Sequence, residues 1–123
     1  MTDHELAAFL AQDAGHILLD LQKWWDRDPA LLGKAGDAQA NEYLVHALRD
    51  VRPDDGLLSE EEKDNPDRLA QARVWIVDPV DGTREYGEGR TDWAVHVALA
   101  IDGKPVIGAV ALPGLGLVLR TDQ

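Results

Sequence analysis

The sequence contains no cysteine, which excludes disulfide bonds, thiol catalysis and thiolate metal sites. Basic residues are scarce: 12 Lys and Arg stand against 23 Asp and Glu, so the formal net charge is −11 at pH 7. That balance argues against nucleic acid as a partner and against an anionic membrane surface. No apolar run approaches the length of a membrane span, and the polar segment Met1–Glu5 lacks the apolar core of a signal peptide. We therefore expect a cytoplasmic protein, and its 123 residues suffice for one domain.

The chain does contain a short apolar run that is followed at once by carboxylates. Val74–Val77 predicts a buried strand, and Pro79 is expected to end that strand just after Asp78. Gly82 permits a sharp turn, so the carboxylates of Asp78 and Asp81 are expected to point into one small volume. An ordinary turn rich in Asp is the alternative interpretation.

Two more oxygen atoms follow in the same turn, the Val80 carbonyl and the Thr83 hydroxyl. Carboxylate, carbonyl and hydroxyl oxygens are the hard ligands that magnesium prefers. The complete string Asp78–Thr83 is also far rarer than the Asp-Gly turn within it, which favours a metal site over a plain turn.

A second group of acids follows a second short strand. Gly56–Ser59 is predicted to be a strand that ends at Glu60 and Glu61. If this strand lies beside the one that precedes Asp78, three or four carboxylates meet without a base between them. Such a cluster is unfavourable unless cations neutralise it. A solvated surface is the alternative for the acidic run Glu60–Glu62.

The remaining pattern predicts two helices and an antiparallel meander. The first helix is capped by Thr2 or Asp3 and runs to about residue 25, and the second begins at Asp37, its N-cap, and runs to about residue 51. Segments 26–36, 62–73 and 84–90 are predicted loops, with a short helix as the alternative for 62–73. Strands are predicted at 93–101, 106–112 and 117–119, with His96 on the less apolar face of its strand.

These elements predict an α+β fold with helices packed on one face of an antiparallel sheet. The last predicted strand, 117–119, is expected at the sheet edge, where its free backbone could pair with a second copy of the chain to form a homodimer.

The string Trp75–Thr83 resembles the signature of the inositol monophosphatase superfamily of magnesium-dependent, lithium-sensitive phosphatases. The segments Ser59–Glu61 and Asp92–Val97, together with Asp37, support the resemblance. The continuation Arg84–Tyr86 is similar to that of CysQ-type 3'(2'),5'-bisphosphate nucleotidases. Members of the family form a layered α-β-α-β-α sandwich. The resemblance implies that residues 1–123 are its N-terminal, metal-binding portion, without the C-terminal half.

The resemblance also implies an activity, the hydrolysis of 3'-phosphoadenosine 5'-phosphate to AMP and phosphate, a reaction linked to sulfate assimilation. The implied partner is a phosphorylated small molecule, either a nucleoside bisphosphate or an inositol phosphate. Inositol-1-monophosphatase activity is therefore one alternative. A truncated metal-binding module without catalysis is an alternative of another class.

The same resemblance implies a role for each matching residue. Asp37 and Thr83 would orient and deprotonate the attacking water, and the backbone amides of Gly82 and Thr83 would hold the phosphate. Two or three Mg²⁺ ions would be bound by Glu60, Glu61, Asp78, Asp81 and the Val80 carbonyl.

Overall fold

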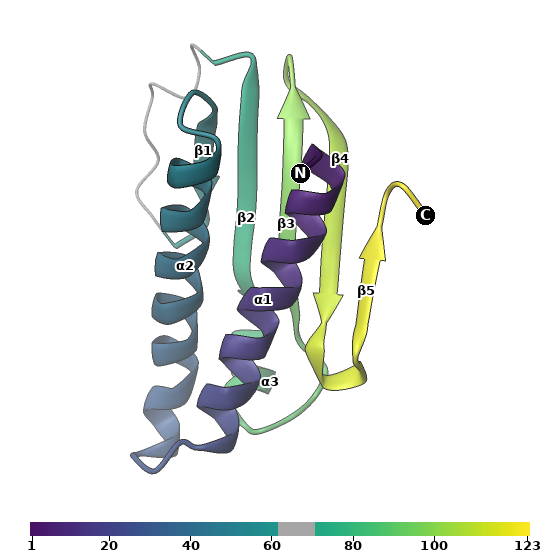
Figure 1. The fold of residues 1–123 in the computed structure, drawn as a ribbon. Coiled ribbons are helices and arrows are strands. Elements are labelled where there is room, and N and C mark those ends of the chain that lie inside the picture. The colour runs from purple at the N-terminus through teal and green to yellow at the C-terminus, as the bar shows by residue number, and fades with distance from the viewer. Residues whose placement is uncertain (62–70) are drawn as a thin grey trace.

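The computed structural model describes residues 1–61 and 71–123 as two long helices lying on one face of a five-stranded sheet (Figure 1). This confirms the predicted α+β class. The helices are α1 (Asp3–Lys23), α2 (Leu32–Val51) and the short α3 (Thr83–Gly87). The strands are β1 (Gly56–Ser59), β2 (Arg73–Asp81), β3 (Ala94–Ile101), β4 (Lys104–Leu112) and β5 (Leu117–Arg120). The predicted loop or helix at 62–73 lies mostly outside the described residues.

The strands follow one another across the sheet in chain order, β1-β2-β3-β4-β5. Strands β2 to β5 pair antiparallel, as predicted, whereas β1 pairs parallel with β2, so the sheet is mixed. Ser59 lies opposite Val77 in that parallel pair, and the Glu60 amide donates to the Val77 carbonyl over 3.3 Å. The two strands therefore deliver their following residues to the same end of the sheet.

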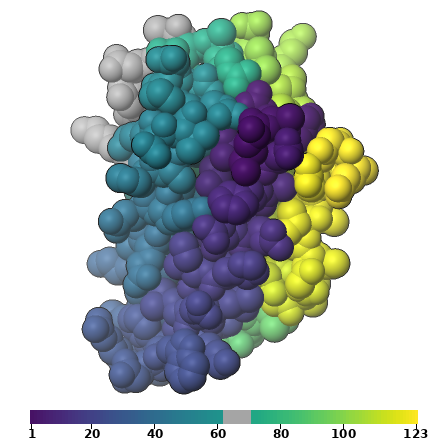
Figure 2. Space-filling model, viewed as in Figure 1, coloured from purple at the N-terminus to yellow at the C-terminus, as the bar shows by residue number. Residues whose placement is uncertain are grey.

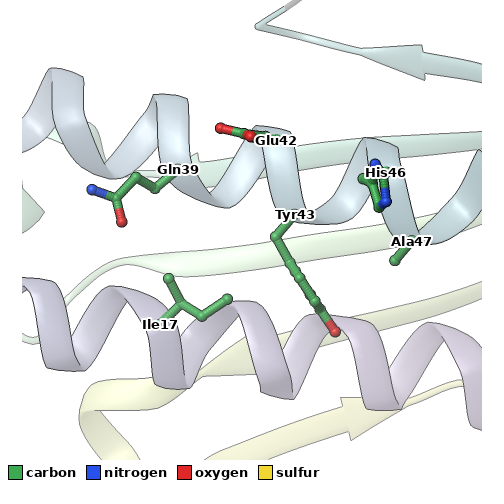
Figure 3. A pocket seen from close by; sticks show the side chains of 6 residues that line it. All are labelled: Ile17, Gln39, Glu42, Tyr43, His46 and Ala47. Atoms are coloured by element: carbon green, nitrogen blue, oxygen red, sulfur yellow. The ribbon is translucent and has the colours of Figure 1, made fainter.

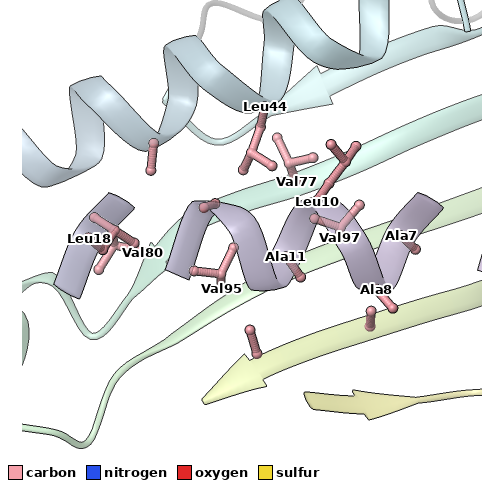
Figure 4. Close-up of a cluster of buried hydrophobic side chains, with 14 of the residues drawn as sticks. Ala7, Ala8, Leu10, Ala11, Leu18, Leu44, Val77, Val80, Val95 and Val97 are labelled. Atoms are coloured by element: carbon pink, nitrogen blue, oxygen red, sulfur yellow. The ribbon is translucent and has the colours of Figure 1, made fainter. Parts of the chain in front are cut away.

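Helix α1 begins with a capping box, because Thr2 and Glu5 exchange side-chain-to-backbone hydrogen bonds of 3.1 Å. Its buried face packs on β3, β4 and α2, while α2 also packs on β2. Figure 4 shows Leu10 of α1 and Leu44 of α2 over Val77 and Val97 of the sheet. This apolar layer fixes the helices to one face of the sheet. In the described part of the chain, neither of these helices is apolar enough to cross a membrane.

The two faces of the sheet differ in burial. Side chains that point toward the helices are almost fully buried, among them Trp75, Val95 and Leu99. On the opposite face, register places Asp78, His96, Val110 and Leu119 in one row, and each is half-buried or exposed. Strand β5 forms the sheet edge beside α1 in Figure 2. Its predicted pairing with a second chain stays a prediction.

The prediction that Asp37 caps α2 is wrong, because α2 begins at Leu32. A 3-10 turn over Pro29–Leu31, capped by the Asp28 carboxylate at 3.0 Å from the Ala30 amide, leads directly into the helix. The predicted loop 26–36 therefore ends early. Asp37 lies more than one turn inside α2, where its side chain projects from the helix surface rather than closing its end.

Strand β2 also runs further than predicted. Pro79 does not end it, because a register irregularity between Asp78 and Asp81 lets the strand continue to Asp81. A bulge tolerates a residue that has no N–H to donate. The predicted loop 84–90 begins within α3, and β4 starts at Lys104 rather than at residue 106.

Candidate active site

Asp37 on α2 and Thr83 at the start of α3 lie in contact. The Thr83 Oγ1 atom is 3.2 Å from Asp37 Oδ1 and 3.2 Å from the Val80 carbonyl oxygen. The hydroxyl has a single proton, so it donates to one of these acceptors at a time. The structure thus brings together two residues that are 46 positions apart and that the resemblance paired.

Two glycines of α2 allow this contact. A Cβ atom on Gly33 would lie 3.1 Å from Thr83 Cγ2, and one on Gly36 would lie 2.5 Å from Tyr86 Cε2. The buried Tyr86 is held on its other side by a 2.7 Å hydrogen bond from its hydroxyl to the Leu18 carbonyl. Any larger residue at position 36 would push α3 away from α2, so the close approach of the two helices depends on glycine there.

The acidic residues predicted as metal ligands come from the ends of two neighbouring strands. Glu60 and Glu61 directly follow β1, while Asp78 and Asp81 lie in the last part of β2. The parallel pairing of these strands brings the four residues to one end of the sheet. The buried Ser59 hydroxyl donates a hydrogen bond to Asn41 Oδ1. It also accepts a hydrogen bond of 3.3 Å from the Glu61 amide.

Burial and neighbouring carboxylates raise the pKa values of both Asp37 and Asp78. Burial, and then the charge of Glu61, raises the pKa of Asp37 to about 6, although the Thr83 hydrogen bond opposes the shift. Burial, and then the charges of Glu60 and Asp81, raises the pKa of Asp78 above its usual range. Each acid is therefore near enough to others to be destabilised when ionised.

His96 is a member of this region that sequence reasoning missed. Its Nε2 atom lies 3.0 Å from Asp81 Oδ2, and β2–β3 pairing places the residue opposite Asp78. The alternation of apolar residues correctly put His96 on the other strand face. Only the register between strands, which the sequence does not reveal, shows which carboxylate it meets.

The donor atoms fit a hard divalent cation. All the predicted ligands are carboxylate or carbonyl oxygens. Within residues 1–61 and 71–123, neither Asp37, Glu60, Glu61 nor Asp78 forms an ion pair with a Lys or Arg. The same ranges contain no group of three acidic or His side chains packed closely enough to hold a metal ion. Like charges without a counter-ion favour such separation, and the ligand set stays a prediction.

A pocket of about 460 Å³ opens beside the Asp37–Thr83 pair. Glu61, Lys34 and Asn41 also line it. Gly82 lies next to this pocket in the chain and adopts a left-handed conformation with φ 92°, which favours glycine. The role of the Gly82 and Thr83 amides in holding phosphate stays a prediction.

Comparison with known proteins identifies the family to which this chain belongs. The sequence profile of the inositol monophosphatase family matches residues 19–122, and the chain belongs to that family. The crystal structure of CysQ from Bacteroides thetaiotaomicron, a bacterial member of the family, superimposes with a TM-score of 0.77 at 30% identity. The superposition covers 88% of this chain and 41% of that one.

Two curated phosphatases are similar in sequence to this chain. The chain is 49% identical to the 3'-phosphoadenosine 5'-phosphate phosphatase of Mycobacterium leprae, over 99% of this chain and 49% of the relative. It is 34% identical to a histidinol-phosphatase of Chlorobaculum parvum, over 98% of this chain and 48% of the relative. The chain thus spans about half the length of the curated relatives it matches.

Proposed function

We propose that this chain is the metal-binding portion of a magnesium-dependent phosphatase that hydrolyses 3'-phosphoadenosine 5'-phosphate to AMP and phosphate. The observation that carries the proposal is the Asp37–Thr83 contact beside carboxylates that have no Lys or Arg partner among the described residues. The name of the relative that is 49% identical supports the choice of substrate.

The side chains divide into those that hold cations and those that handle the water. Glu60, Glu61, Asp78, Asp81 and the Val80 carbonyl would hold two or three Mg²⁺ ions. When bound, these ions neutralise the phosphate oxygens and make water a better nucleophile at neutral pH.

Asp37 is suited to remove the proton from the attacking water. In the chain without metal, the pKa of Asp37 is about 6, so its carboxylate is mostly ionised at neutral pH and can accept a proton. The Thr83 hydroxyl, 3.2 Å away, restrains the orientation of the Asp37 carboxylate. As the bond from the new oxygen to phosphorus forms, the bond to the 3'-oxygen on the opposite side breaks, and that oxygen takes up a proton from solvent.

The proposal is tested by phosphate release from 3'-phosphoadenosine 5'-phosphate with and without Mg²⁺. We expect slow release that requires Mg²⁺ and that falls by at least about a hundredfold in Asp37→Asn, because the general base is lost. Release that is unchanged in this variant, or that persists with excess chelator, would contradict the mechanism. Magnesium binding without hydrolysis of any ester would favour a non-catalytic metal-binding module.

Competing substrates are compared in the same assay. Inositol 1-phosphate tests the inositol monophosphatase alternative, and histidinol phosphate tests the activity named for the Chlorobaculum relative. We expect the nucleotide to be the fastest substrate. A higher rate with inositol 1-phosphate or histidinol phosphate would support the same reaction mechanism with that ester as the substrate.

A further inference from the structure

A second pocket adjoins the candidate active site, because Lys34 and Thr83 line both. The first pocket, of about 460 Å³, also contacts Asp37 and Glu61. The second, of about 540 Å³, is lined by Arg84 as well. A ligand bound against Thr83 can therefore extend from one pocket into the other past the Lys34 side chain.

The second pocket has a charge balance unlike that of the chain. Lys34 and Arg84 line it against one acid, Glu88, whereas the whole sequence has 23 acids and 12 Lys and Arg. Lys34 is exposed and forms no ion pair with a described residue. Glu88 is shared, since its carboxylate lies 3.1 Å from Arg84 and 3.7 Å from Arg90. The pocket can thus offer positive charge to an anion.

The walls that carry these cations are fixed relative to Thr83. A Cβ atom on Gly33 would lie 3.2 Å from the Thr83 carbonyl oxygen, and one on Gly87 would lie 3.5 Å from the Gly33 nitrogen. The first turn of α2 therefore packs tightly on α3. Lys34 follows Gly33 and Arg84 follows Thr83, so both basic side chains start from this packed junction.

We propose that Lys34 and Arg84 bind a second anionic group of the substrate while its first phosphate lies in the acid-lined pocket. The proposal rests on the proposed function and deepens it, because it makes the pair a determinant of specificity. A sugar carrying two phosphates would then be preferred over the same sugar carrying one.

The contrast with another pocket supports this choice. The hollow between α1 and α2 shown in Figure 3 is also about 540 Å³ in volume, but Glu42, Tyr43 and His46 line it without Lys or Arg. Pocket size alone therefore does not select an anion site. The two basic side chains and the shared Thr83 wall distinguish the pocket beside α3.

The test measures binding by calorimetry, so that it does not depend on turnover. Adenosine 3',5'-bisphosphate and adenosine 3'-monophosphate are titrated into the chain with Mg²⁺, using the Asp37→Asn background to prevent hydrolysis. We expect the bisphosphate to bind more tightly. Lys34→Gln should weaken bisphosphate binding about tenfold, because a charged hydrogen bond is lost. It should weaken monophosphate binding clearly less, although Lys34 also lines the first pocket. Arg84→Gln should have a smaller effect, about threefold, because its side chain is 85% exposed.

Two further variants sharpen the result. Glu88→Gln removes the competing carboxylate and should strengthen bisphosphate binding. Lys104→Gln, at the exposed start of β4, should change neither affinity. Equal affinities of the Asp37→Asn chain for the two ligands would overturn the proposal. Equal weakening of both affinities when Lys34→Gln is added would overturn it too. A selective loss in Lys34→Gln supports it even if the chain proves not to hydrolyse the nucleotide, which separates this outcome from failure of the proposed function.

Discussion

The two ends of strand β2, roughly 25 Å apart by strand rise, hold acidic residues in opposite surroundings. At the start of β2, Arg73 lies 3.0 Å from both carboxylate oxygens of Asp3 and 3.0 Å from Asp55. Arg52 reaches Asp3 as well, at 3.1 Å. Burial alone would raise the pKa of Asp3, but its hydrogen bonds to Arg73 and Arg52 hold it below its ordinary value.

At the far end of β2 the pKa of Asp78 is raised, and so is that of Asp37 across the site. Both ends of β2 carry acidic residues, so the number of acids does not decide whether they stabilise the fold; their partners do. The paired end ties α1 to the sheet. We call the other end unpaired because Asp37 and Asp78 form no ion pair with a Lys or Arg among the described residues, and it lowers stability whenever these two carboxylates are ionised without cations. Titratable groups held in this condition are typical of functional sites.

The largest effect is expected from breaking the paired end. Arg73→Met leaves Asp3 and Asp55 without their main partner, and we expect the free energy of unfolding to fall by about 2 kcal/mol. Urea unfolding followed by tryptophan fluorescence measures it. Lys104→Met, at the exposed start of β4, is the matched control and should change little. A loss as small as that of the control would mean that the paired end does not stabilise the fold.

The next effect concerns the unpaired end. Asp78→Asn removes one charge from the cluster, so we expect stability without metal to rise slightly and Mg²⁺ affinity to fall at least about tenfold. Calorimetric titration with MgCl₂ measures the affinity. Asp102→Asn, in a turn position with φ 52° that Asn tolerates, provides an equal charge change away from the site. The same Mg²⁺ affinity in both variants would argue against a cation site at Asp78.

The pH dependence of stability should separate the two ends. Asp37 has a pKa of about 6 in the folded chain against 3.8 unfolded, so the folded state binds more protons between these values. The contribution of Asp37 to the free energy of unfolding therefore falls as the pH rises from about 4 to about 6 in the absence of metal. Asp3 acts oppositely: its contribution is present above pH 3.8 and is lost as the pH falls through its lowered pKa.

Urea midpoints measured across this range test the assignment. Asp37→Asn should flatten the decline between about pH 4 and 6, and Mg²⁺ should reverse it by favouring the ionised carboxylate. An unaltered decline in the variant would place its origin elsewhere in the chain.

The smallest effect is expected at His96. Its contact with Asp81 is 3.0 Å long, but the two side chains are 39% and 62% exposed. We expect His96→Gln to change the free energy of unfolding by less than about 0.5 kcal/mol at neutral pH. Thermal unfolding of the two proteins at equal ionic strength measures this. A change comparable to that of Arg73→Met would show that the two ends of β2 differ less than their exposure suggests.

Short-range patterns in the sequence predicted most of the elements correctly. The alternation of apolar residues predicted β3 and its antiparallel pairing with β4. The apolar run Val74–Val77 predicted the centre of β2. The start of α2 was missed because Gly33 and Gly36 indicate a loop when considered alone. Their place in a helix depends on Thr83 and Tyr86, which approach from a distant part of the chain.

The amino-acid sequence by itself determined the family and the α+β class, and it predicted a set of oxygen ligands, because these depend on residue types at short and fixed spacings. Only the tertiary structure decided which of those residues meet. The Asp37–Thr83 contact, the His96–Asp81 contact and the shared wall of two pockets all join residues that are at least 15 positions apart. Such contacts depend on strand register and on how closely helices approach one another, and both are set by packing over the whole core.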